Sequence, residues 1–304
     1  MSQVIDDRSP GQASGEGSRL RDFLAMIKFS HTLFALPFAL LGGALAAHTP
    51  NGWRGRFQDW VGILLCMAAA RSAAMAFNRL VDRRFDASNP RTATRHLPSG
   101  RLSVASVVGF TVACSAGFIL ATTLFLPNRW PLYLSVPVLG WILAYSYTKR
   151  FTSLAHFWLG ISLSLTPIAA WIALRGNLEW PPLLLALAVF LWVSGFDIIY
   201  SCQDVDFDRR AGLHSVPRAL GVSAALRLAA LCHLLMLLPL TVLGLAYPLG
   251  WIYYSGVAAV AVLLFYEHSL VRPEDLTNVN LAFFQVNIAI SMGLLFFGVA
   301  DLLI

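Results

Sequence analysis

Long apolar segments separated by shorter polar connections run along the chain from about residue 23 to residue 304. Each segment is close to the roughly 20 mainly apolar residues that a helix needs to cross a bilayer. Nine segments fit this pattern, and they cover residues 23–47, 60–81, 103–126, 131–147, 154–174, 182–203, 222–247, 251–267 and 280–303. The pattern therefore predicts an all-α polytopic membrane protein, a bundle of nine transmembrane helices.

Composition supports a membrane protein. Of the 304 residues, 57% are hydrophobic and only 12% are charged, whereas soluble domains carry about 25% charged residues. A soluble fold with this balance would expose large apolar patches. The formal net charge of +6 is of the kind that membrane proteins place in cytoplasmic loops, so we expect a lipid bilayer and no nucleic acid as the surroundings of this chain.

The distribution of Lys and Arg predicts the orientation. Fifteen of them fall in the N-terminal stretch and in the connections after the second, fourth, sixth and eighth segments, against four on the opposite side. By the positive-inside rule, the N-terminus and the two Asp-rich loops face the cytoplasm and the C-terminus lies on the far side. Residues 1–19, polar and rich in Gly and Ser, are expected to form a disordered cytoplasmic tail. Residues 20–304 then form a single transmembrane domain in a membrane that we expect to be the bacterial inner membrane.

A first polar constellation follows the second apolar segment. Asn78, Asp82 and Asp86 are spaced by four residues, so a helix places them on one face, turn by turn. Arg71 lies seven residues before Asn78, on nearly the same face and inside the apolar segment. A charge at that depth is costly unless it is paired, and such charges usually mark function.

A second constellation follows the sixth segment. Asp204 and Asp208 repeat the spacing of four residues, and Asp197 precedes Asp204 by two turns. Asp206 would point elsewhere on a helix. Two carboxylate pairs, distant in sequence, are thus predicted at equivalent helix ends on one side of the membrane.

Paired carboxylates suit Mg²⁺, which takes one or two protein carboxylates together with phosphate oxygens and water. Two facing pairs can hold ions around a diphosphate and neutralise the charge that develops as its C–O bond breaks. Basic residues that follow the fourth and sixth segments, Lys149, Arg150 and Arg209, can stabilise the same charge. An allylic diphosphate ionises toward a carbocation when its C–O bond breaks. An apolar bundle would keep water away from the carbocation, so that an electron-rich ring held nearby captures it.

Other interpretations predict different features. Asp and Arg at a single helix end are usually just solvated charges. Two loops in which the Asp residues have the same spacing of four favour a metal and diphosphate site instead. A cation transporter would place its acids near the midplane on broken helices, and an alcohol phosphotransferase would carry an Asp signature containing DG that this chain lacks. His156, His233 and His268 fit interface or packing roles, and Lys28 and His31 fit either an acceptor pocket or the membrane interface.

These motifs resemble those of the UbiA superfamily of intramembrane prenyltransferases, and the resemblance covers the chain from about Leu20. The carrying residues are Asn78-x₃-Asp82-x₃-Asp86 with Arg71 before it, Asp204-x₃-Asp208, Tyr145-x₃-Lys149-Arg150, and the stretch NPRTATRHLPSG at 89–100. The resemblance implies that Asp82, Asp86, Asp204 and Asp208 bind Mg²⁺, that Asn78 and Lys149 contact the diphosphate, and that Arg71 contacts diphosphate or an acceptor carboxylate. It adds Tyr145 and Arg150 as substrate contacts, and Asp197 as a residue that orients or deprotonates the acceptor. Arg209 is a further candidate substrate contact because its positive charge directly follows the second motif.

The implied reaction is transfer of a polyprenyl group from polyprenyl diphosphate to an aromatic acceptor, with Asp82, Asp204 and Asp197 at its centre. The pattern is nearest to enzymes that prenylate 4-hydroxybenzoate in ubiquinone synthesis. Some features depart from that branch, among them Val205 and Phe207 within the second motif and His214 where a Lys is common. These features are also similar to a subgroup that prenylates a dihydroxynaphthoate in menaquinone synthesis, and the two acceptors stay open at this point.

Overall fold

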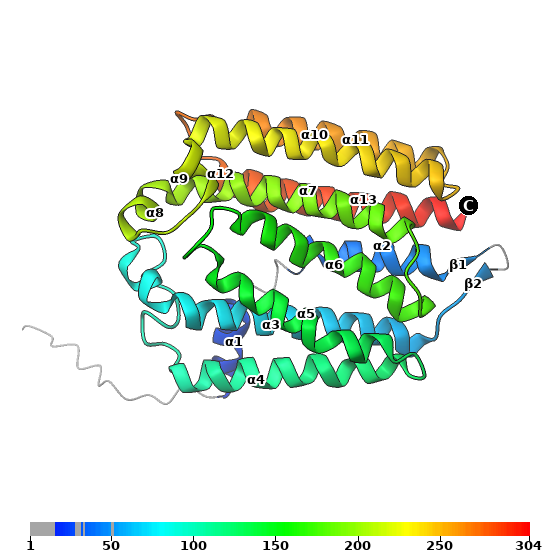
Figure 1. Ribbon diagram of the computed structural model, residues 1–304, viewed down its shortest axis with the longest axis horizontal. Coiled ribbons are helices and arrows are strands. Elements are labelled where there is room, and N and C mark those ends of the chain that lie inside the picture. The colour runs from blue at the N-terminus through cyan, green and yellow to red at the C-terminus, as the bar shows by residue number, and fades with distance from the viewer. Residues whose placement is uncertain (1–15, 28–31, 33, 50–51) are drawn as a thin grey trace, which may run out of the picture.

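The computed structural model describes residues 16–27, 32, 34–49 and 52–304. Apart from one antiparallel pair of two-residue strands, the regular elements of these residues are helices, most of which run lengthwise through an elongated bundle (Figure 1). The all-α prediction is therefore confirmed. The elements are α1 (Glu16–Met26), α2 (Leu36–Ala47), β1 (His48–Thr49), β2 (Gly52–Trp53), α3 (Phe57–Ser88), α4 (Val104–Ala121), η2 (Thr122–Phe125), α5 (Trp130–Thr148), α6 (Ala155–Arg175), α7 (Pro181–Ser201), η3 (Cys202–Asp204), α8 (Val205–Ala211), α9 (Val216–Leu220), α10 (Val222–Ala246), α11 (Trp251–Ser269), α12 (Val279–Leu281), η4 (Ala282–Val286) and α13 (Asn287–Leu303).

Six helical segments of the described chain are long and apolar enough to cross a membrane: Phe57–Ser88, Val104–Phe125, Ala155–Arg175, Pro181–Ala211, Val222–Ala246 and Val279–Leu303. The predicted segments 131–147 and 251–267 correspond to α5 and α11, of 19 residues each. The first predicted segment, 23–47, is not one continuous helix, because α1 ends at Met26 and α2 begins at Leu36 with Pro37 in its first turn. Proline suits a helix start and disfavours helix in the residue before it.

Several sequence-based expectations concern residues outside the described part. Lys28 and His31 lie there, as do residues 1–15 of the expected tail. Residues 16–19 belong to the start of α1.

Helix α7 is central to the bundle and positions the site. It packs against α6 on one side and against α10 on the other, and it is the most buried of the six candidate spans. Trp192 is fully buried, and its ring contacts Phe38 of α2 and Phe196 of its own helix, with ring centroids 5.0 and 4.9 Å away. Asp197 is the next residue after Phe196, so it lies directly beside this apolar cluster.

The approach of α6 to α7 depends on Gly160. A Cβ atom at this position would lie 2.5 Å from Ser194 Oγ and 2.8 Å from the carbonyl oxygen of Phe190. Glycine therefore permits a backbone separation that any side chain would prevent. The second turn of α6 is thereby held against the middle of α7.

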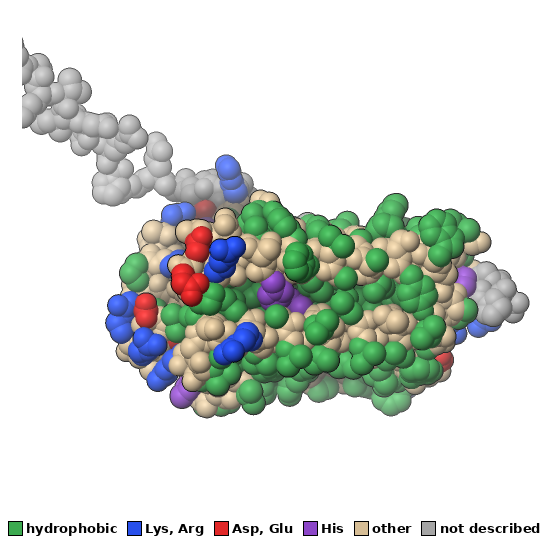
Figure 2. Space-filling model, turned by 90° about the horizontal axis from the view of Figure 1, so that it is seen from above, with side chains coloured by type: hydrophobic (Ala, Val, Ile, Leu, Met, Phe, Trp, Pro, Cys, Tyr) green, Lys and Arg blue, Asp and Glu red, His purple; other side chains and the backbone are tan. Residues whose placement is uncertain are grey.

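The surface is divided by polarity. Figure 2 shows apolar side chains along the length of the bundle and most of the visible Lys, Arg, Asp and Glu side chains at one end, with a few at the other. Large apolar side chains such as Val112, Leu120, Phe265 and Phe296 are more than half exposed along the sides. The charged end is where α3 and α7 end and where α8 and α9 lie (Figure 1). Such a surface suits a molecule whose sides contact lipid.

Candidate active site

A cavity of about 630 Å³ lies inside the bundle, lined by residues of α2 to α7, of η2, η3 and α8, and of the loops at the charged end. Its polar part holds residues of both acidic motifs, namely Asn78, Asp82, Asp86, Asp204 and Asp208. The remainder is mainly apolar, with Ala39, Ile63, Met67, Phe118, Phe125 and Ile172 among its lining. The structure thus brings both predicted constellations to one end of a single apolar chamber.

The first motif lies on helix rather than in a loop. Helix α3 continues to Ser88, so Asn78, Asp82 and Asp86 occupy its last turns. The Asn78 amide donates to Asp82 Oδ2 at 2.9 Å. Asp86 accepts a hydrogen bond from Arg95 at 2.6 Å, while its other oxygen, Oδ2, is buried without a partner in the described structure. The predicted one-face arrangement is therefore present, with one carboxylate oxygen left unsatisfied.

The second motif is divided between η3 and α8. Asp204, in η3, accepts hydrogen bonds from Arg91 and from the Asn89 amide, the latter at 3.3 Å. Asp208, in α8, is only 2% exposed, and its Oδ2 has no hydrogen-bond partner in the described chain. Asp206 is solvent-exposed and does not line the cavity, as its place between the other two acids predicted.

Cationic groups line the same polar region. Arg150 donates to the carbonyl oxygen of Val81 at 2.9 Å and reaches Asp82 Oδ1 at 3.5 Å. Lys149 lines the cavity beside it. Burial alone would lower the pKa of Lys149, but four surrounding carboxylates outweigh it and raise that pKa, with Asp208 contributing most. The ammonium group is thus held charged at the mouth of an apolar chamber.

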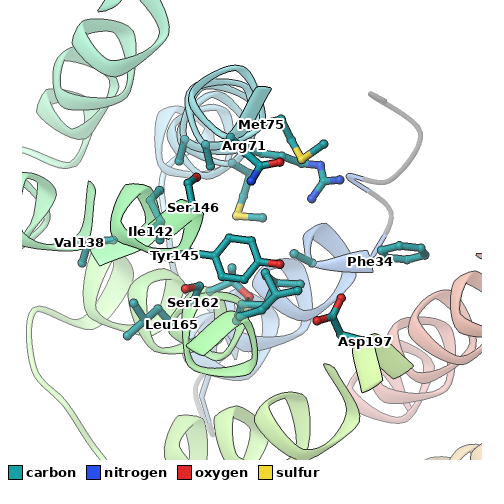
Figure 3. A pocket seen from close by; sticks show the side chains of 18 of the residues that line it. Phe34, Arg71, Met75, Val138, Ile142, Tyr145, Ser146, Ser162, Leu165 and Asp197 are labelled. Carbon is teal, nitrogen blue, oxygen red and sulfur yellow. Dashed lines mark hydrogen bonds between the residues drawn. The ribbon is translucent and has the colours of Figure 1, made fainter. Parts of the chain in front are cut away.

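Deeper in the cavity, Arg71, Tyr145 and Asp197 face a common space (Figure 3). Arg71 Nε is buried and has no hydrogen-bond partner among the described residues. Asp197 contacts His156, whose Nδ1 lies 2.6 Å from Asp197 Oδ2. His156 is therefore a buried partner of a cavity carboxylate, which its interpretation as an interface or packing residue missed.

Arg209 is the one predicted site residue that the structure places away from the cavity. Its side chain is 66% exposed and lies 3.4 Å from Asp206 on the outer face of α8. Helical geometry explains the difference, because Arg209 follows the inward-facing Asp208 by one residue and is rotated away from it by about 100°. A contact between Arg209 and substrate is therefore not supported by its position.

Three arginines were missed as site residues by sequence reasoning and were treated only as loop charges. Arg79 is buried on α3 and donates to Asn78 Oδ1 at 3.3 Å, while Arg91 and Arg95 bind the motif carboxylates. All three line the cavity. The sequence signal that could have indicated them is the high density of Arg between residues 79 and 95. These charges were used only to predict the orientation of the chain in the membrane.

The described residues fit a divalent cation in their donor chemistry. They contain no group of three or more His, Cys, Asp or Glu side chains gathered as a ready-made metal site. Asp86 and Asp208 each present an unsatisfied, buried carboxylate oxygen at the cavity. Mg²⁺ characteristically takes only one or two such oxygens, with phosphate and water completing its octahedron.

Comparison with known proteins agrees with this geometry. Residues 35–289 match the model of the UbiA prenyltransferase family. The chain is 32% identical to the 4-hydroxybenzoate octaprenyltransferase of Vibrio campbellii over 257 residues, which is 83% of this chain and 87% of the relative. It is similar to the apo structure of a UbiA homologue from Aeropyrum pernix K1, with a TM-score of 0.78 and 31% identity over 87% of this chain and 95% of the other.

A second structural neighbour shows the shared fold. It is a UbiA homologue from Archaeoglobus fulgidus, solved bound to GPP and Mg²⁺, with a TM-score of 0.72, 20% identity, and coverage of 93% of this chain and all of the other.

Proposed function

The chain belongs to the UbiA prenyltransferase family, and from this premise we propose that it transfers a polyprenyl group from polyprenyl diphosphate to 4-hydroxybenzoate in quinone synthesis of the ubiquinone type. The protein is an aromatic prenyltransferase and an integral membrane protein. The observation that carries the proposal is the single chamber that joins two carboxylate motifs and several cations to a long apolar interior. The acceptor is supported by the name of the Vibrio campbellii relative.

The diphosphate is proposed to lie at the polar end. Lys149, Arg79 and Asn78 can donate to its oxygens there, because all three line the cavity beside the motif carboxylates. Asp82, Asp86, Asp204 and Asp208 would hold Mg²⁺, because all four line the cavity and two of them present unsatisfied oxygens there. The A. fulgidus homologue solved with GPP and Mg²⁺ supports the choice of metal. The chemistry that Mg²⁺ supplies in such a site is neutralisation of charge on the departing diphosphate.

The isoprenoid chain is proposed to occupy the apolar part. Side chains such as Met67, Phe118 and Phe125 exclude water from the allylic carbon and its tail. As the C–O bond breaks, its electron pair leaves with the diphosphate. Without water nearby, the electron-rich ring is the nucleophile that captures the allylic cation.

The acceptor is proposed to lie between the polar and apolar parts. Arg71 has an unpaired, buried Nε and is suited to an acceptor carboxylate. Tyr145 and Asp197 face the same space (Figure 3). A new C–C bond forms at a ring carbon next to the hydroxyl group, and the ring proton leaves to a base, the role that we assign to Asp197.

We also infer nine membrane spans, with α2, α5 and α11 added to the six long apolar helices, since all three lie within the bundle (Figure 1). The cytoplasmic side is proposed for the charged end, and the bacterial inner membrane for the bilayer, because most Lys and Arg residues gather at that end. Residues 20–304 form one domain in this proposal, preceded by a cytoplasmic tail.

The test is an assay of the purified protein in detergent with a polyprenyl diphosphate, Mg²⁺, and either 4-hydroxybenzoate or a dihydroxynaphthoate. Mass spectrometry follows the mass of one prenyl group added to the ring. We expect product from 4-hydroxybenzoate and none when a chelator removes Mg²⁺. Product from the naphthoate alone would move the enzyme to menaquinone synthesis, and an intact diphosphate with no product on either ring would overturn the proposal.

A further inference from the structure

His156, the second residue of α6, is fully buried between two elements of the site. Its Nδ1 lies 2.6 Å from Asp197 Oδ2 on α7. Its Nε2 lies 3.3 Å from the backbone nitrogen of Val216, the first residue of α9. The imidazole therefore connects the cavity carboxylate with the segment that directly follows the second acidic motif.

The two contacts determine where the imidazole carries its proton. A backbone N–H can only donate, so Nε2 of His156 must accept the hydrogen bond from Val216. A neutral imidazole then carries its proton on Nδ1, which donates to Asp197. Ser201 Oγ lies 3.5 Å from the same Nε2, but its hydroxyl donates to the Ile198 carbonyl at 2.8 Å and leaves this assignment unchanged.

One carboxylate oxygen of Asp197, Oδ2, therefore has a hydrogen-bond partner, and the other, Oδ1, has none among the described residues. No described residue donates to its Oδ1, and the side chain lines the cavity near Tyr145 and Arg71. The hydrogen bond that Nδ1 donates to Oδ2 restricts the rotation of the carboxylate. Oδ1 is the atom left to meet a ligand in the cavity.

We propose that His156 is a positioning residue that holds Asp197 as an oriented carboxylate facing the acceptor, through a hydrogen bond whose direction Val216 fixes. This inference rests on the proposed function, in which Asp197 takes the proton lost from the acceptor. His156 touches neither substrate and acts through Asp197. Val216 follows the segment that carries Asp208. His156 therefore contacts both Asp197, at the proposed acceptor site, and the segment next to the proposed diphosphate site.

The kinetic test compares two substitutions that place an amide differently. Asparagine at 156 can donate from near the Nδ1 position, and glutamine reaches the Nε2 position instead. We expect His156→Gln to lower kcat by about 10- to 100-fold, the range seen when a partner that orients a ligating side chain is removed. His156→Asn should keep kcat within about fivefold of the wild type, because its amide can still donate to Asp197, and the KM for prenyl diphosphate should change little in either variant. Equal losses in the two variants would overturn the proposal.

A double-mutant cycle tests whether His156 acts through Asp197. Adding His156→Gln to Asp197→Asn should cost no more than about twofold, because the group through which His156 acts is already gone. Losses that multiply in the double variant would show a separate, structural role and would sink the positioning proposal.

A measurement without substrate separates this inference from the proposed function. Histidine labelled with ¹⁵N, of which the chain has seven residues, reports the protonated nitrogen by NMR in detergent. We expect a neutral ring protonated on Nδ1 that disappears in His156→Asn and whose proton signal moves upfield in Asp197→Asn. A proton on Nε2 of His156 would overturn the inference even if the enzyme is active. If instead the Nδ1 proton is observed but the enzyme prenylates no aromatic acceptor, the proposed function is wrong and the inference about His156 stands.

Discussion

Arg91, in the loop after α3, binds both carboxylate oxygens of Asp204, the last residue of η3. Its Nε donates to Oδ1 at 2.9 Å across 113 residues of sequence, and a second guanidinium nitrogen donates to Oδ2. A third donates to the Tyr200 hydroxyl at 2.9 Å. Burial opposes the charge of Arg91, but the hydrogen bonds and charges of Asp204 and Tyr200 together outweigh it and raise the pKa of Arg91. An ion pair thus joins the loop that follows the first acidic motif to the second acidic motif.

Arg91→Ala should destabilise the protein when Mg²⁺ and diphosphate are absent. Asp204 is only 9% exposed, so the variant leaves a nearly buried carboxylate with the Asn89 amide as its remaining side-chain donor. We expect a loss of about 1–3 kcal/mol, the cost of removing a hydrogen bond to a charged group, reduced because Arg91 itself is 34% exposed. Thermal unfolding in detergent measures it.

Arg209→Ala is the matched control for that variant. The Arg209–Asp206 pair is 66% and 78% exposed, and exposed pairs contribute little to stability. Its Tm should equal that of the wild type. Equal Tm values for both variants would contradict a structural role for the Arg91–Asp204 pair.

Asp82→Ala should lower prenyl transfer by about 100-fold or more, since a bound metal contributes several kcal/mol to stabilisation of the transition state. Asp206→Ala is its control, because Asp206 lies outside the cavity on the exposed face of α8 and should leave the rate within about twofold, as surface substitutions usually do. Initial rates at saturating Mg²⁺ measure both. Full activity in Asp82→Ala would remove that residue from the proposed metal site.

The acidic motifs illustrate how far the sequence could predict this site. A spacing of four residues places side chains on one helical face wherever that helix packs, so Asn78, Asp82 and Asp86 could be assigned together from their spacing alone. The same geometry predicted the outward direction of Asp206. Local periodicity was sufficient because α3 runs without interruption through the whole first motif.

Contacts between distant segments were not predictable in this way. Nothing in the periodicity of α6 indicates that His156 meets Asp197, 41 residues later, because that contact depends on the close approach of two helices at Gly160. The pairing of Arg91 with Asp204 depends on the path of an irregular loop. Arg209 was misplaced because charge type was considered without helical direction.

Gly195→Ala should destabilise the bundle at the contact of α7 with α10. A Cβ there would lie 2.3 Å from the His233 ring and 3.1 Å from the Ala229 carbonyl oxygen. Overpacking of this kind costs about 1–3 kcal/mol. Gly109→Ala, on the exposed face of α4 with nothing within 4 Å, should be neutral or slightly stabilising because alanine favours helix. A thermal shift of the same size in both variants would argue against the close contact.

Arg71→Met should weaken binding of the aromatic acceptor selectively. The substitution keeps most of the apolar stem but removes the guanidinium that we assign to the acceptor carboxylate. A charge-assisted hydrogen bond contributes about 1.5–3 kcal/mol, so the KM for 4-hydroxybenzoate should rise about 10- to 100-fold. The KM for prenyl diphosphate should stay near the wild-type value, because Arg71 lies two turns deeper than Asn78 on α3. An acceptor that carries a neutral group in place of the carboxylate should be used about equally by both enzymes. If instead the KM for prenyl diphosphate rises and that for the acceptor does not, Arg71 belongs to the diphosphate site.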